Sequence, residues 1–276
     1  MRTRYRKILV SAALTALALT AIFASAANAA EPNPVYKDFA GCPSKAENAR
    51  ISFCEKFEFT GGHISFGRRD IPVTNPIVVS GGVETKTGNF DFNENGGMIP
   101  VAQPVPGGVI GMTGLNWLDA LSSKALKLNA VVELAGQPGS LFASAWSLPV
   151  KIHLESPVLG KGCYLGSDAA PIELNLTTGT TAPPLPNVPI SGHLGSPSAP
   201  EAERPEVEVS TGGLFVDNAY AVPAATGCQL EVGSFVLPID SLVNAGYHLP
   251  AAAGTNETML EFSDSFVSPK VVYSAS

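Results

Sequence analysis

The stretch 150-VKIHLE-155 alternates apolar and polar side chains, with Val150, Ile152 and Leu154 on one side. A second stretch, 172-IELNLT-177, repeats the pattern. Because successive side chains of a β-strand point to opposite faces of a sheet, each stretch predicts a strand with one apolar and one polar face. Strands of this kind are typical of an antiparallel sheet that is covered on one side.

Short apolar runs bounded by glycine and proline recur along the rest of the chain. The first is 51-ISFCEKFEF-59, after which Gly61-Gly62 is expected to turn the chain into the next run. Further strand candidates are 63–66, 77–79, 126–134, 206–209, 214–216, 229–237, 259–262 and 267–272. Many short strands at close spacing predict an all-β fold, an antiparallel β-sandwich. There is no alternation of strands with helices, which argues against a doubly wound nucleotide-binding fold.

Little of the chain has a helical period. We expect one short helix over 115–126, and one or two helical turns over 238–245 closed by Gly246. The Gly/Pro-rich segment 98–114 is expected to be an irregular connection. Residues 179–205 contain seven prolines and predict a long exposed loop.

The N-terminal segment has the features of a secretory signal peptide. Four cations and no acid lie within residues 1–7, an apolar run follows over 8–27, and Ala27-Asn28-Ala29 offers the small residues of a cleavage site. We expect cleavage after Ala29, with Ala24-Ser25-Ala26 as the alternative site. A single-pass anchor competes, since the apolar run is close to the roughly 20 residues that span a bilayer. Neither a hydrophobic tail nor a basic stop signal stands at the C-terminal end, so we expect a secreted, extracellular protein with no transmembrane segment after cleavage.

The remaining residues, 30–276, are expected to form one β-rich domain, with two domains divided at the proline-rich segment as the alternative. Removing four cations shifts the formal charge from −7 to −11. An acidic surface repels phosphate, so nucleic acid is not an expected partner.

Four cysteines follow the expected cleavage site: Cys42, Cys54, Cys163 and Cys228. An even count in an oxidising compartment favours two disulfides, for which three pairings are possible. We favour Cys42 with Cys54 and Cys163 with Cys228. A zinc site competes, but the chain has no C-x-x-C pair and its four histidines are scattered.

The segment 91-DFNENG-96 fits the opening of a calcium-binding loop, with Asp91, Asn93 and Asn95 as the candidate metal ligands. The match is incomplete, because Ala102 stands where a bidentate glutamate belongs. The competing interpretation is a β-hairpin that turns at Asn95-Gly96. Calcium is the one candidate cofactor.

Catalytic motifs are weak throughout. No G-x-S-x-G, H-E-x-x-H or Walker segment is present. A dispersed triad could use any of the four histidines, His63, His153, His193 or His248, and a cluster lies at 63–70 with Arg68, Arg69 and Asp70. A pair of carboxylates in an aromatic cleft also stays open, although Trp117 and Trp146, the two tryptophans, lie in apolar surroundings that suggest core.

The segments 161–192 (KGCYLGSDAAPIELNLTTGTTAPPLPNVPISG) and 95–111 (NGGMIPVAQPVPGGVIG) resemble parts of uncharacterised secreted proteins of actinobacteria. The resemblance covers under a quarter of the chain. It implies export and carries no functional residue across.

These observations favour a non-enzymatic binding or structural protein, secreted or in the cell envelope, whose loops contact a cell-wall polymer, a lipid or an extracellular protein. The alternative is a secreted hydrolase with a dispersed site. Whether the chain is an enzyme stays open, and a histidine within hydrogen-bond reach of a serine and an acid in a deep pocket would favour the hydrolase.

Overall fold

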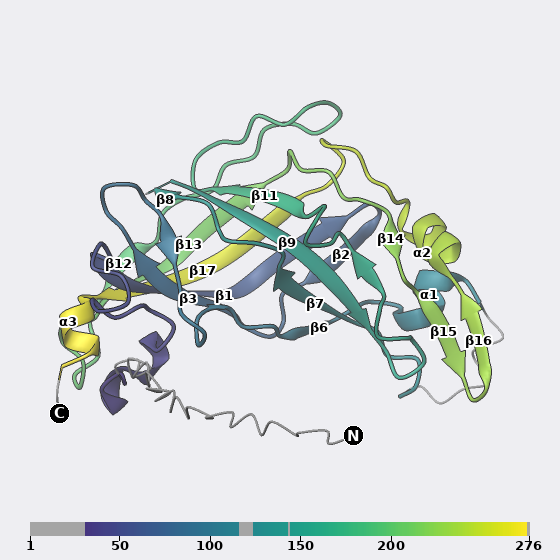
Figure 1. Cartoon of the computed structure of the whole chain (residues 1–276). Helices are drawn as coiled ribbons and strands as arrows, with labels where there is room; N and C mark the ends of the chain where they lie inside the picture. Colours follow the sequence, from purple (N-terminus) through teal and green to yellow (C-terminus); the bar gives the residue numbers. More distant parts are fainter. Residues whose placement is uncertain (1–30, 116–123, 143, 275–276) are drawn as a thin grey trace, which may run out of the picture.

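The computed structural model describes residues 31–115, 124–142 and 144–274 (Figure 1). The strands are β1 (Phe53–Phe66), β2 (Arg69–Pro72), β3 (Ile77–Val83), β4 (Phe90–Asp91), β5 (Gly97–Met98), β6 (Ala102–Pro104), β7 (Asn129–Leu134), β8 (Leu141–Phe142), β9 (Ala145–Glu155), β10 (Tyr164–Leu165), β11 (Ile172–Thr177), β12 (Ser196–Ser198), β13 (Glu208–Asp217), β14 (Ala225–Thr226), β15 (Gln229–Val232), β16 (Phe235–Pro238) and β17 (Thr258–Val267). The helical segments are η1 (Pro34–Phe39), α1 (Gly108–Thr113), α2 (Asp240–Tyr247) and α3 (Pro269–Val272). All strand pairs are antiparallel, so the predicted all-β antiparallel fold with short helices is confirmed.

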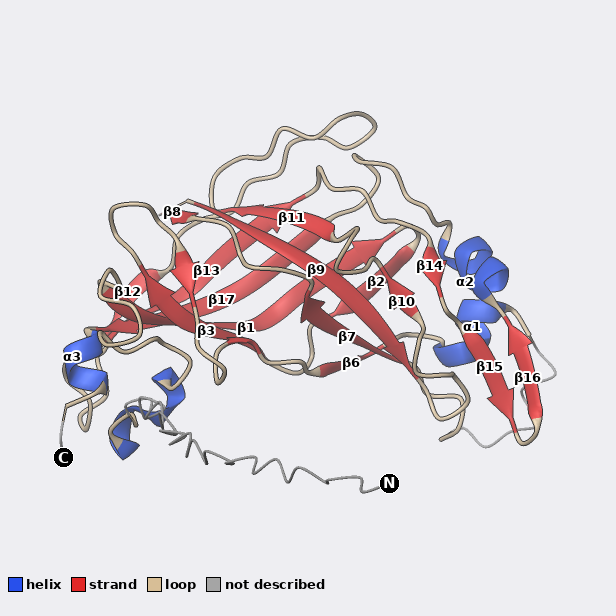
Figure 2. Cartoon of the chain, viewed as in Figure 1, coloured by secondary structure: helices blue, strands red, loops and turns tan. Residues whose placement is uncertain are grey.

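One large curved sheet holds most of the strands (Figure 2). Its order is β14-β10-β9-β11-β13-β17-β1-β3-β4, and β7 and β6 continue it from the other edge of β9. The ends of the sheet approach each other, since β5 lies close to β7 and β2 close to β6. The large sheet therefore curves into one half-barrel. β15 and β16 form a small second sheet.

Alternating side chains of β9 fill the space inside the half-barrel. Trp146, Leu148 and Val150 are almost fully buried, as are the next two alternate residues of the strand. The Trp146 ring lies 4.9 Å from the Phe57 ring of β1 and 5.1 Å from the Phe90 ring of β4. Each such side chain stabilises the fold by roughly 1.5–3 kcal/mol. The predicted alternation in β9 and β11, and the predicted burial of Trp146, are confirmed.

Two β-bulges bend the sheet on either side of β17. The register of β1 shifts between Phe59 and Gly61, and that of β13 shifts between Ser210 and Gly213. Gly62 has a φ of 91°, and a Cβ there would lie 1.9 Å from the Met259 carbonyl oxygen. The expected turn at Gly61-Gly62 is therefore wrong: the glycines allow a bulge within one long strand, and the bulge sharpens the curvature.

The helices differ from the prediction in three places. Part of the expected helix 115–126, including Trp117, lies outside the described residues. The segment 98–114 is not wholly irregular, because it contains β6 and α1. The expected strand 267–272 is wrong: β17 ends at Val267 and α3 follows, since the Ser268 hydroxyl accepts from the Lys270 N–H and Pro269 suits a first helical turn.

Helix α2 confirms the predicted turns near 238–245 but continues through Gly246 to Tyr247. Its C-cap is His248, in the left-handed conformation at φ 57°. A Cβ on Gly246 would lie 2.0 Å from the Met112 carbonyl oxygen at the end of α1. This glycine therefore permits the close approach of α1 and α2 and does not end the helix.

Both favoured disulfides are present, joining Cys42 to Cys54 and Cys163 to Cys228. The first fastens the segment after η1 to β1, beside a small apolar cluster that includes Phe39. The second ties the start of β10 to the start of β15 and spans the proline-rich segment. Paired cysteines of this kind are typical of extracellular proteins.

The first part of the proline-rich segment 179–205 runs over the surface at the top of Figure 1, and Leu185 in this part is 87% exposed. It is nevertheless fastened, because the Asn187 side chain donates to the carbonyls of Asn218 and Asn256. Its later part forms β12, which pairs with β13.

The expected signal peptide, residues 1–29, lies outside the described residues. In the part of the chain that the structure describes, no helix combines the length and the apolar character needed to cross a bilayer. The assignment of 30–276 to one domain stays a prediction, although strands from Phe53 to Val267 share the large sheet.

Candidate functional site

The four histidines lie apart, and in the described residues none of them is hydrogen-bonded to a serine hydroxyl. His63 lies 3.5 Å from Glu257, and His193 contacts the Leu194 carbonyl. His153 stacks on the Tyr164 ring at 4.3 Å. The arrangement that would favour a dispersed triad is therefore not formed by these side chains.

The residues of the 63–70 cluster point to different partners. They form the hairpin of β1 and β2, in which Ser65 pairs with Asp70. The Arg69 guanidinium donates to the Gly111 carbonyl and lies 5.6 Å from the Tyr247 ring. His63 instead faces Glu257, so the structure does not bring His63 and Arg69 into one site.

The candidate calcium ligands are already engaged in protein contacts. Asp91 accepts from the Asn48 side chain, and the Asn93 amide donates to the carbonyls of Ala40 and Cys42. The Asn93 side-chain oxygen accepts from the Asn95 N–H and closes a local turn. The predicted hairpin at Asn95-Gly96 is wrong, since β4 and β5 both pair with the same edge of β3. Within the described ranges no three His, Cys, Asp or Glu side chains group as a metal site. Calcium binding stays a prediction.

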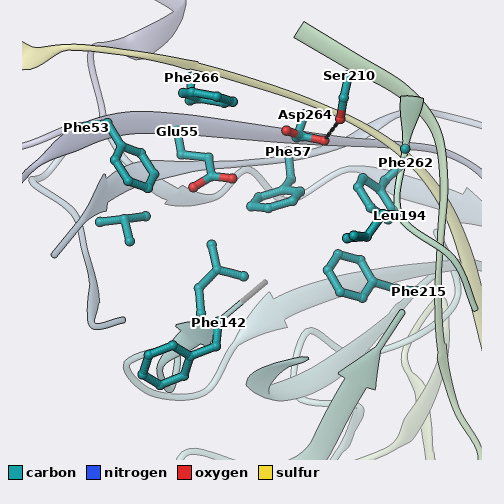
Figure 3. A pocket seen from close by; sticks show the side chains of 13 residues that line it. Phe53, Glu55, Phe57, Phe142, Leu194, Ser210, Phe215, Phe262, Asp264 and Phe266 are labelled. Carbon is teal, nitrogen blue, oxygen red and sulfur yellow. Dashed lines mark hydrogen bonds between the residues drawn. The ribbon is translucent and has the colours of Figure 1, made fainter. Parts of the chain in front are cut away.

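A cavity of about 490 Å³ opens inside the curved sheet, between β1, β13 and β17 and the two loops that carry β8 and Leu194 (Figure 3). Its walls are mainly phenylalanine rings, which are in mutual contact: the Phe53 and Phe266 rings are 5.7 Å apart, and the Phe57 and Phe262 rings 5.8 Å apart. We call this the phenylalanine pocket. Its full lining is Phe53, Glu55, Phe57, Val83, Leu141, Phe142, Leu194, Gly195, Ser210, Phe215, Phe262, Asp264 and Phe266.

Two carboxyl groups enter this apolar space from neighbouring strands. In the register of β1 and β17, Glu55 pairs with Phe266 and Phe57 with Asp264, so all four side chains share the inner face. The strand β13 places Ser210 opposite Asp264, and its hydroxyl donates to the Asp264 carboxylate. Figure 3 shows both carboxyl groups beside the Phe57 ring.

Burial changes the protonation of both acids. Glu55 is only 7% exposed, and no described residue donates a hydrogen bond to its carboxyl group. Burial, assisted by the nearby Asp264 charge, raises the pKa of Glu55 to about 8. Burial also raises the pKa of Asp264, against the hydrogen bonds from Ser210 and from its own N–H. Glu55 is therefore mostly protonated at neutral pH.

The pocket has no basic side chain among its lining residues, and Ser210 is its only hydroxyl. The mouth is apolar, because Phe142 is 55% and Leu194 is 60% exposed. This arrangement can hold an apolar molecule and offer it two acidic groups in a medium of low polarity.

The sequence interpretation did not identify Glu55 or Asp264 as site residues. The signal was present: in 53-FCEKFEF-59 and 260-LEFSDSF-266 an acid occupies a position that alternation assigns to the apolar face. An acid in the apolar register of a strand is an unusual choice, because an unpaired buried carboxylate is costly.

Scans against protein-family models, curated proteins and solved structures each found no match for this chain. The resemblance to secreted actinobacterial proteins stays a prediction, and the site must be interpreted from its own chemistry.

Proposed function

We propose that the chain is an exported, non-enzymatic binding protein that holds a small apolar ligand in the phenylalanine pocket. Among the expected partners, a cell-wall polymer, a lipid or an extracellular protein, this favours a lipid-like molecule. The observation that carries the proposal is the cavity of about 490 Å³ lined by phenylalanine rings. Pockets for small molecules have volumes of about 300–1,000 Å³ and mostly apolar walls with few polar groups.

Two features support export and a preformed site. The two disulfides suit an oxidising compartment, in agreement with the expected signal peptide. Five of the six phenylalanine rings in the lining stand on the long strands β1, β13 and β17, which pair within the large sheet, so the cavity does not need to form when a ligand arrives.

The test is the binding of a neutral, environment-sensitive dye, N-phenyl-1-naphthylamine, to the protein without residues 1–29. We expect a blue-shifted, saturable fluorescence signal. Replacing Leu194 by tryptophan adds bulk at the mouth and should weaken dye binding. Leu185→Trp, on the same loop but outside the lining, is the matched control and should bind as the wild type does. Absence of saturable binding, or equal binding by Leu194→Trp and wild type, would refute the proposal.

A second candidate is hydrolysis, with the two carboxyl groups as acid and base. The observation in its favour is that Glu55 is held protonated at neutral pH beside a second acid. Against it, Ser210 is the only other polar side chain in the lining and is already bonded to Asp264, so sugar hydroxyls would find few partners. Turnover of nitrophenyl glycosides or esters that is lost in both Glu55→Gln and Asp264→Asn would favour this candidate over binding.

A further inference from the structure

We propose that the ligand of the phenylalanine pocket carries a basic nitrogen, whose ammonium group is held between Glu55 and Asp264 while its apolar part lies against the phenylalanine rings. This inference rests on the proposed binding function and names the chemical class of ligand: a cationic amphiphile.

The charges in the pocket favour a cationic ligand. Neither Glu55 nor Asp264 forms an ion pair with any described residue, and the lining contains no Lys, Arg or His. Two acids in one apolar cavity repel each other when ionised and are poorly solvated. An ammonium group would remove both penalties at once. A carboxylate ligand would bring a further negative charge beside these two acids and is disfavoured.

The aromatic rings around the acids also favour a cation. The rings of Phe53, Phe57 and Phe266 lie around the Glu55 side chain (Figure 3). The faces of aromatic rings attract cations, and the attraction is stronger away from water. The walls that accept the apolar part of the ligand can therefore also stabilise its charged end.

The orientation of the acids and the charges near them favour a cation as well. Ser210 directs the Asp264 carboxylate from the neighbouring strand. Glu208, exposed on β13, pairs with Phe266 and so lies on the same face, two residues along the strand from Ser210. The chain as a whole has a formal charge of −7. Cations are thus favoured both at the cavity and on the way to it.

Proton release should accompany binding. On β17, Asp264 is the titratable group that faces Glu55, and Glu208 of β13 lies farther along the same face. The lining residues on β3, on β8 and in the loop at Leu194 and Gly195 have no ionisable side chain. Burial keeps Glu55 protonated at neutral pH, and an arriving ammonium favours its ionised form. Affinity for the cation should therefore rise as the pH rises toward 8.

The experiment compares three probes with the same eight-carbon tail: octylammonium, 1-octanol and octanoate. Each is titrated against N-phenyl-1-naphthylamine bound to the protein without residues 1–29 at pH 7, and displacement of the dye gives its affinity. We expect octylammonium to bind at least about tenfold more tightly than 1-octanol, and octanoate to bind most weakly. Calorimetry in phosphate and in Tris, whose ionisation enthalpies differ, should show up to one proton released for each octylammonium bound.

Three isosteric variants connect the result to the site. Asp264→Asn and Glu55→Gln should each reduce the preference for octylammonium over 1-octanol, and circular dichroism verifies that each is folded. Since the two variants are independent, failure of one to fold leaves the other as a test. Glu261→Gln, on the exposed face of the same strand β17, is the matched control and should keep the preference.

The outcomes separate the two proposals. Equal affinity for octylammonium and 1-octanol, or a preference for octanoate, would overturn the cationic ligand while the binding function stands. A preference for octylammonium that survives in both site variants would overturn it as well. If neither the dye nor any of the three probes binds, the binding function itself fails.

Discussion

Replacing Glu55 by glutamine keeps the shape of the side chain and removes one titrating group from the phenylalanine pocket. Burial raises the pKa of Glu55 from its usual 4.5 to about 8 in the folded chain. Between these two values the folded chain holds a proton that the unfolded chain has lost. The contribution of Glu55 to the free energy of unfolding therefore falls as the pH rises from about 4.5 to 8. Below and above this range it does not change with pH.

The free energy of unfolding falls by about 1.4 kcal/mol for each pH unit in this range. Between pH 5 and pH 8 the wild type should therefore lose about 3–4 kcal/mol of its free energy of unfolding, a loss that Glu55→Gln should not show. Urea denaturation followed by circular dichroism at pH 5, 6, 7 and 8 gives both free energies, and their difference isolates Glu55. Glu58→Gln, on the opposite face of the same strand, should follow the wild type. A difference between Glu55→Gln and wild type that stays constant with pH would refute the assigned protonation.

Three further predictions concern packing, covalent bonds and metal. Gly246→Ala should lower the free energy of unfolding by about 1–3 kcal/mol, since its Cβ would meet the Met112 carbonyl, whereas Gly111→Ala, with 3.7 Å to its nearest neighbour, should change little in the same urea titration. Replacing Cys163 and Cys228 by serine should cost about 4 kcal/mol, against about 3 kcal/mol for Cys42 and Cys54, because the first pair closes the longer loop; the reverse order would contradict this explanation. Calcium or a chelator should leave the thermal midpoint unchanged, because Asp91 and Asn93 already bond to protein groups; a rise with calcium that is absent in Asp91→Asn would support the calcium loop.

The strands with one buried and one exposed face could be predicted from the sequence, because their apolar and polar side chains alternate. In β9 and β11 every second side chain is buried, as the pattern of 150–155 and 172–177 indicates. The two disulfide pairings could also be anticipated. The signals that failed were local ones with two meanings, such as glycine, which serves as a turn, a cap or a point of close approach.

Gly61, Gly62 and Gly246 illustrate this ambiguity. The roles of Gly62 and Gly246 depend on Met259 and Met112, and Gly61 lies against Glu261; these partners are distant in sequence, so no window around each glycine could identify them. The pocket was missed for a related reason. Alternation places Glu55 on the apolar face of its strand, but only the pairing of β1 with β17 shows that it shares a cavity with Asp264 from the other end of the chain.

The outermost strands of the large sheet have a consequence for behaviour at high concentration. In the described residues the strands at its margins, β2, β4, β5, β6, β8, β12 and β14, have at most four residues each. Pro72, Pro104 and Pro197 lie within three of them and donate no backbone hydrogen bond. In the described residues, the margins of this sheet therefore offer a second chain no long row of free amide and carbonyl groups with which to pair.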